Sequence, residues 1–141
     1  GQMAYANGYF NTPGDAQLSL YLVRNTSNTA TWTNLYLDGE SEWLFVPVGR
    51  AWTFEILVTG AANGGISGGY RIQGILENHN GVLWFIGTPV VTVLGEDNSA
   101  WDVQVTVSDP LDAFGVQVKG GYAGQIIQWI ASIQILEVAM P

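Results

Sequence analysis

Apolar and polar residues alternate along most of this sequence, most regularly at residues 52–59, 101–108 and 114–119. Successive side chains of an extended strand point to opposite faces, so a period of two predicts strands that bury one face and expose the other. The same pattern predicts further strands at residues 17–24, 34–37, 43–46, 70–77, 82–86, 90–94 and 126–138. No segment has the apolar spacing of an amphipathic helix, so we expect little or no helix.

Turn-forming pairs separate the predicted strands. Asp38-Gly39 and Asn80-Gly81 are typical of tight hairpins, because such turns need positive φ angles. About ten short strands joined in this way predict an all-β protein, an antiparallel β-sandwich of jelly-roll-like form. We expect residues 8–141 to form this single domain and residues 1–7 to be a flexible or truncated N-terminal edge.

The predicted strand at residues 126–138 has two different faces. One face is apolar throughout, which predicts that it lies in the core. The other face combines aliphatic side chains with neutral amides and a hydroxyl, and its candidate interface residues are Gln128, Ile130, Ser132, Gln134 and Leu136. A neutral, partly apolar face suits contact with another surface better than contact with water, so we predict an oligomer interface there. The alternative is that both faces are buried inside a monomeric sandwich.

Composition and charge exclude several classes of function. Charged residues are 11% of the chain, against about 25% in an ordinary soluble domain, and the net charge is −8. Four basic residues cannot neutralise a row of phosphates, which excludes nucleic-acid binding, and they give little attraction to an anionic membrane. No apolar run is long enough to insert into a membrane as a helix. The absence of cysteine excludes disulfides, cysteine-ligated zinc and thiol catalysis.

The aromatic content is the main indication of a ligand. Six Trp and six Tyr favour carbohydrate binding, because flat rings stack on sugars while nearby amides bond to hydroxyl groups. Trp52, Trp101 and Trp129 are in phase with apolar neighbours, so we assign them to the core. The candidate ligand-binding residues are Trp32, Asn34, Trp43 and Arg24. Burial or an interface role is the alternative for the tryptophans, and a solvated ion pair is the alternative for the arginine.

Catalysis and metal binding have less support. His79 is the single histidine, it lies at a predicted hairpin tip, and no nucleophile elbow accompanies it. Glu96-Asp97-Asn98 with Asp102, and Asp109 with Asp112, suit bonds to turn backbone, and calcium or a glycosidase carboxylate pair are the alternatives. We therefore expect a protein that is not an enzyme, with no catalytic residues, no metal site and no cofactor.

A series of short motifs, taken in order, resembles the C-terminal β-rich domain of phage tail fibre and related virion structural proteins. The motifs are Gly14-Asp15-Ala16-Gln17-Leu18-Ser19-Leu20, Leu35-Tyr36-Leu37-Asp38-Gly39, Pro47 through Trp52-Thr53-Phe54, Gly69-Tyr70-Arg71-Ile72-Gln73-Gly74, Gly95-Glu96-Asp97, Ala100-Trp101-Asp102-Val103, Val118-Lys119-Gly120, Ala123-Gly124-Gln125-Ile126-Ile127-Gln128-Trp129-Ile130-Ala131 and Glu137-Val138. Together they span residues 14 to 138.

The resemblance implies a non-enzymatic virion component. Such a component is usually a trimer that projects from a fibre, tail or capsid. We expect a homotrimeric knob of a tail fibre, whose partners are its own copies, other virion proteins and a host surface glycan. Two alternatives remain open. One is a capsid decoration or head-fibre protein that stabilises the shell, and the other is a carbohydrate-binding module.

Overall fold

The computed structural model describes the backbone of residues 2–8 and all of residues 14–141. These residues form eleven strands and no helix: β1 (Gln2–Gly8), β2 (Ala16–Ser27), β3 (Thr33–Leu35), β4 (Leu44–Phe45), β5 (Arg50–Ala62), β6 (Ile66–His79), β7 (Val82–Phe85), β8 (Val90–Glu96), β9 (Asp102–Ser108), β10 (Ala113–Lys119) and β11 (Ile127–Ala139). The predicted all-β class is confirmed. None of the described residues forms a helix long and apolar enough to cross a membrane.

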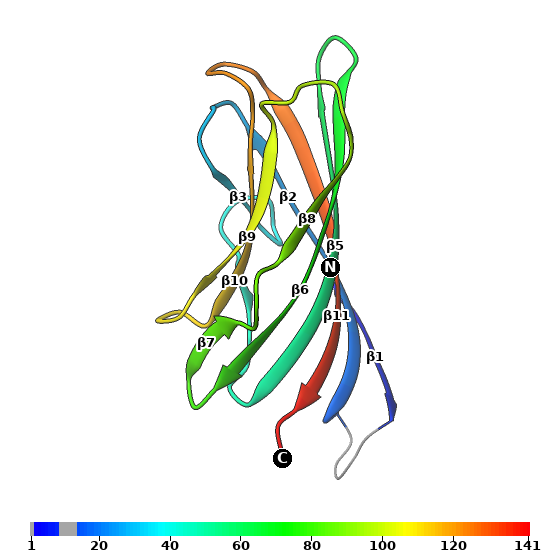
Figure 1. The fold of residues 1–141 in the computed structure, drawn as a ribbon, viewed down its shortest axis with the longest axis vertical. Helices are drawn as coiled ribbons and strands as arrows, with labels where there is room; N and C mark the ends of the chain where they lie inside the picture. The colour runs from blue at the N-terminus through cyan, green and yellow to red at the C-terminus, as the bar shows by residue number, and fades with distance from the viewer. Residues whose placement is uncertain (1, 9–13) are drawn as a thin grey trace.

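The strands form two antiparallel sheets, which face each other as the layers of a sandwich (Figure 1). The larger sheet has seven strands in the order β1-β2-β11-β5-β6-β7, and β8 also pairs with β6. The smaller sheet has four strands, in which β9 pairs with one side of β10 while β3 and β4 pair with successive parts of its other side. The predicted antiparallel β-sandwich is therefore confirmed.

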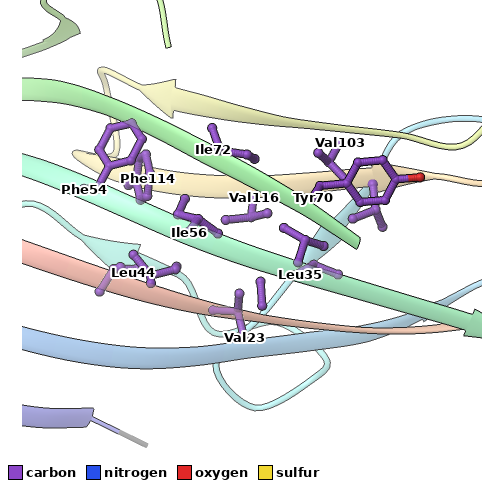
Figure 2. Packing of buried hydrophobic residues seen from close by; sticks show 14 of the residues in the cluster. Val23, Leu35, Leu44, Phe54, Ile56, Tyr70, Ile72, Val103, Phe114 and Val116 are labelled. Atoms are coloured by element: carbon purple, nitrogen blue, oxygen red, sulfur yellow. The ribbon is translucent and has the colours of Figure 1, made fainter. Parts of the chain in front are cut away.

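The hydrophobic core lies between the two sheets and is built by alternation along the strands (Figure 2). In β5 the pattern of buried and exposed residues is strict, and its inward side chains meet those of β10 across the sandwich. The ring centroid of Phe114 lies 4.9 Å from that of Phe54 and 6.3 Å from that of Trp52. Trp52, Trp101 and Trp129 are 1%, 3% and 2% exposed, so their predicted place in the core is confirmed.

The two predicted hairpins have different outcomes. Asn80-Gly81 joins β6 to β7 with φ angles of 55° and 80°, so this tight turn is confirmed. Asp38-Gly39 does not form one. The strands on either side of it, β3 and β4, pair with β10 and not with each other, so the segment between them is a longer loop.

Residues 2–8 form β1, which pairs with the first half of β2. Beyond that half, β2 has a free side, and the backbone of Tyr36 pairs there with that of Arg24. The separation of an N-terminal edge at residues 1–7 from the domain at 8–141 stays a prediction. Residues 1 and 9–13 lie outside the described residues.

Candidate functional site

The outer face of the smaller sheet carries a row of aromatic and amide side chains. Phe114, Val116 and Val118 of β10 point into the core, so the alternate residue Gln117 points outward. Gln117 is paired in register with Asn34 of β3. We call the row the aromatic–amide face; its residues, all half-buried, are Trp32, Asn34, Tyr36, Trp43, Gln104 and Gln117.

The amides of this face form a hydrogen-bonded chain across three strands. Gln104 Nε2 donates to Gln117 Oε1 at 2.6 Å, and Gln117 Nε2 donates to Asn34 Oδ1 at 2.9 Å. Asn34 Nδ2 donates in turn to the Tyr36 hydroxyl at 3.4 Å. Each amide nitrogen has two hydrogens and uses one of them in this chain, so each keeps one hydrogen for a further acceptor.

Trp43 lies against the sheet because Gly115 leaves room for it. A Cβ at Gly115 would stand 2.9 Å from Trp43 Cζ3, so only a residue without a side chain allows the ring this position. The Tyr36 ring stands nearly perpendicular to the Trp43 ring, at an interplanar angle of 85° and a centroid distance of 5.2 Å. The two rings thus make an apolar corner beside the amide chain.

Trp32 is held at the other end of the face by Lys119. The Lys119 Nζ lies 4.8 Å from the centroid of the Trp32 ring, a cation–π contact. A ligand that stacked on this side of the ring would displace an interaction of about 0.5–1 kcal/mol. Trp43 has no such competitor among the described residues, so it is the stronger stacking candidate.

The structure brings together three of the four predicted ligand-binding residues, Trp32, Asn34 and Trp43. The fourth, Arg24, lies on β2 in the larger sheet and donates to the carbonyls of Leu37 at 3.3 Å and Asp38 at 3.4 Å. The ligand-binding role of all four stays a prediction.

Sequence reasoning missed three residues of the aromatic–amide face. Tyr36 continues the alternation of Trp32 and Asn34, so the period of two was a usable signal for it. Gln104 and Gln117 are outward positions of predicted strands. They meet only because β9 pairs with β10, and that pairing cannot be inferred from a single sequence.

Arg24 lines a groove on the outer side of the larger sheet. The groove has a volume of about 470 Å³, and the loop between β3 and β4 forms one of its walls. Its lining includes Gln128 and Ile130, two of the predicted interface residues. Arg24 therefore belongs to the same side of the molecule as the predicted interface, opposite to the aromatic–amide face.

The predicted interface residues are open to solvent in this chain. Gln128, Ile130, Gln134 and Leu136 are exposed and Ser132 is half-buried. The smaller sheet covers only the inner face of β11. The alternative, in which one chain buries both faces of this strand, is therefore wrong. Contact with another copy stays a prediction.

Asp38 holds the wall of the groove in place. Its carboxylate oxygen accepts hydrogen bonds from the backbone N–H groups of Glu42, Ser41 and Glu40 at 2.9, 2.8 and 2.9 Å. These donors favour the charged carboxylate, so they hold the pKa of Asp38 well below its usual value.

The lowered pKa of Asp38 makes its contribution to stability depend on pH. A carboxyl with a lower pKa in the folded state stabilises the fold above its unfolded pKa and loses this effect as the pH falls through its folded pKa. Asp38→Ala is expected to lower the melting temperature at pH 7, with a difference from the wild type that shrinks progressively below about pH 4. Thermal unfolding followed by circular dichroism from pH 7 to pH 2 measures this, and a pH-independent difference contradicts it.

In each acidic pair noted in the sequence, a carboxylate bonds to backbone. Asp97 accepts a hydrogen bond from the N–H of Ser67, and Asp109 accepts one from the N–H of Leu83. His79 is exposed at the turn between β6 and β7. Within the described part of the chain, no three carboxylate or histidine groups come together as metal ligands would.

Comparison with known proteins finds a similarity of fold to a solved structure. No family model matches the chain, and no curated protein matches it. The chain is similar to the crystal structure of the tailspike protein gp49 from Acinetobacter baumannii bacteriophage Fri1, a capsular polysaccharide depolymerase. The TM-score is 0.49 at 15% sequence identity, over 90% of this chain and 18% of the tailspike chain.

The similarity is thus to a small part of a phage tail protein. The chain covers less than a fifth of the length of that tailspike. At this identity and TM-score, the similarity shows neither a family nor an activity for the chain.

Proposed function

We propose that this chain is a non-enzymatic binding module of a phage tail, which attaches to a glycan on the host surface as a homotrimer. The observation that carries the binding role is the aromatic–amide face, where the corner made by Trp43 and Tyr36 adjoins a chain of fixed amides. The virion setting is supported by the order of motifs that resembles phage tail fibre domains.

The chemistry of the aromatic–amide face fits a sugar. A pyranose ring has an apolar face, which a flat indole covers, and hydroxyl groups at its edge, which amide N–H and C=O groups satisfy. The amides are fixed in position by one another, so they lose little conformational freedom when a ligand binds. All three belong to strands or to their ends, which hold a site more rigidly than loops do.

Self-association would make such a site useful. A shallow face offers one sugar a small contact, and the affinity of a single site is correspondingly low. Three copies that bind one polymeric glycan convert the second and third contacts into intramolecular events, which raises the overall avidity without a new contact. The predicted interface on β11 is on the opposite side of the sandwich, so association through it leaves all the sites free.

Trp43→Ala is expected to weaken glycan binding by about tenfold, since a lost contact of about 1.4 kcal/mol has that effect. The probe is a panel of neutral and acidic bacterial polysaccharides, screened on an array and then titrated by calorimetry. Trp84→Ala is the matched control, because Trp84 is also a partly exposed tryptophan, 37% accessible, but lies on β7 of the larger sheet.

Binding that Trp43→Ala and Trp84→Ala reduce equally would contradict the assignment of the site, and so would a wild-type chain that binds no polysaccharide of the panel. The location on the particle is tested separately. Gold-labelled antibody at the tail supports the tail assignment, and label over the shell supports a capsid decoration protein.

A further inference from the structure

The outer side of the larger sheet is an open face that spans four strands. We call it the open sheet face, defined as the outward residues of β2, β11, β5 and β6. The register places Ser132 of β11 between Leu22 of β2 and Leu57 of β5, so outward residues of neighbouring strands lie side by side. Six aliphatic residues of this face are 38% to 58% exposed: Leu22, Leu57, Ile75, Ile130, Leu136 and Val138. No described residue covers them.

The charges of the open sheet face cancel. Alternation places two basic residues, Arg24 and Arg71, and two acidic residues, Glu55 and Glu77, on its outward side. Their sum of +2 and −2 is zero, while the whole chain has a net charge of −8. The net negative charge lies on other residues, among them Asp38 and Glu40 of the loop beside Arg24. Two copies of an acidic chain repel each other least when they meet through the strand residues of this face, away from that loop.

Arg71 on this face lacks a partner for its guanidinium group. It lies on β6, between Leu57 of β5 and Thr92 of β8. Its Nε atom is buried without a hydrogen-bond acceptor, and no described residue forms an ion pair with the group. A buried polar atom without a partner is rare in a folded protein, and a guanidinium fork is best satisfied by a carboxylate.

The carboxylate that suits Arg71 is on the same face. Glu55 is exposed on β5, on the next outward rung, and accepts one hydrogen bond from Gln73 Nε2 at 2.9 Å. A carboxylate has about four acceptor positions, so Glu55 keeps capacity for an arginine. The face therefore presents both halves of an ion pair around an exposed leucine, Leu57.

We infer that a second copy of this chain packs on the open sheet face, with Arg71 of each copy paired to Glu55 of the next around Leu57. The inference rests on the proposed self-association and adds the residues that specify it. In a ring of three, Arg71 of each copy pairs with Glu55 of the next copy, so every Arg71 and every Glu55 has a partner. The aliphatic residues listed above supply the buried area, and the ion pair fixes the register.

Light scattering at micromolar protein tests the pairing. The wild type is expected to have the mass of three chains. Arg71→Glu alone and Glu55→Arg alone are each expected to weaken association about tenfold or more, because each places like charges in contact. A mixture of the two variants is expected to recover association in part. In a mixed ring of three, two contacts join different variants and pair opposite charges between positions 71 and 55, while the third joins identical variants and stays repulsive. An ion pair within one chain does not recover on mixing.

Two controls separate folding and net charge from the pairing. Arg71→Gln removes the charge without reversing it and is expected to weaken association less than Arg71→Glu does. Lys119→Glu makes the same change in net charge on the opposite sheet, and its mass is expected to stay that of the wild type. Thermal unfolding of each variant shows whether it is folded.

The outcomes distinguish this inference from the proposed function. A monomeric wild type overturns the self-association and the pairing together, while the polysaccharide titration of Trp43→Ala still stands by itself. A wild-type oligomer that Arg71→Glu and Glu55→Arg leave unchanged overturns only the pairing, and so does a mixture that fails to recover.

Discussion

Phe114→Ala is expected to lower the free energy of unfolding by about 3–5 kcal/mol, which is the usual cost of truncating a buried phenylalanine. Phe114 is 2% exposed and connects the two sheets, because its ring lies on β10 and contacts rings from the opposite layer. The nearest ring centroid is that of Phe54 at 4.9 Å, and those of Trp52 and Phe85 are both 6.3 Å away. A small domain is stable by only about 5–15 kcal/mol, so the loss is a large part of the total.

Chemical denaturation with urea measures the effect of Phe114→Ala, as a shift of the midpoint. Val90→Ala is the control, because Val90 is a large apolar residue that is 58% exposed on β8. Its truncation is expected to change the free energy of unfolding by less than about 0.5 kcal/mol. Equal effects of the two substitutions would mean that the sheets are not joined through Phe114.

The sequence predicted those features of the fold that depend on one strand at a time. Alternation separated the buried from the exposed residues of β5 correctly, and it did the same for β11. Asn80-Gly81 specified its own hairpin because the two residues alone decide the φ angles. In each case the information needed lies within a few neighbouring residues.

Features that depend on which strands pair could not be predicted from the sequence. Residues 90–94 read as a half-buried strand, but Val90, Val91, Val93 and Leu94 are all 41% to 58% exposed. The reason is the position of β8 at the side of β6, where the smaller sheet does not cover it. Asp38-Gly39 read as a hairpin for the same kind of reason, since its flanking strands pair with β10 instead.

The candidate sites show the same division. Trp32 directly precedes β3 and Asn34 lies within it, two residues further on, so the period of two places both side chains on one face. Arg24 was grouped with them only by residue type, and the topology puts it on the other sheet. That Arg71 and Glu55 lie on neighbouring outward rungs was equally hidden, because it arises from the register of β5 with β6.

Gly115→Val is expected both to weaken glycan binding and to lower the stability of the fold, because Gly115 lies under the ring of Trp43. Gly115 is buried in β10, and an added Cβ would stand 2.9 Å from Trp43 Cζ3 and 2.9 Å from Thr106 Oγ1. Both separations are too short for these atoms, so the Trp43 ring must leave the sheet. We expect the free energy of unfolding to fall by about 1–3 kcal/mol, as in other overpacked sites.

Glycan binding by Gly115→Val is expected to fall at least about tenfold, as far as in Trp43→Ala, because the indole no longer holds its angle to Tyr36. Gly95→Val is the matched control: Gly95 is a strand glycine on β8, and no atom lies within 4 Å of its added Cβ. Urea denaturation and calorimetric titration of both variants measure the two effects. A folded Gly115→Val variant that binds glycan with wild-type affinity would contradict the assignment of Trp43 to the site. A displaced indole cannot present the same surface to a sugar.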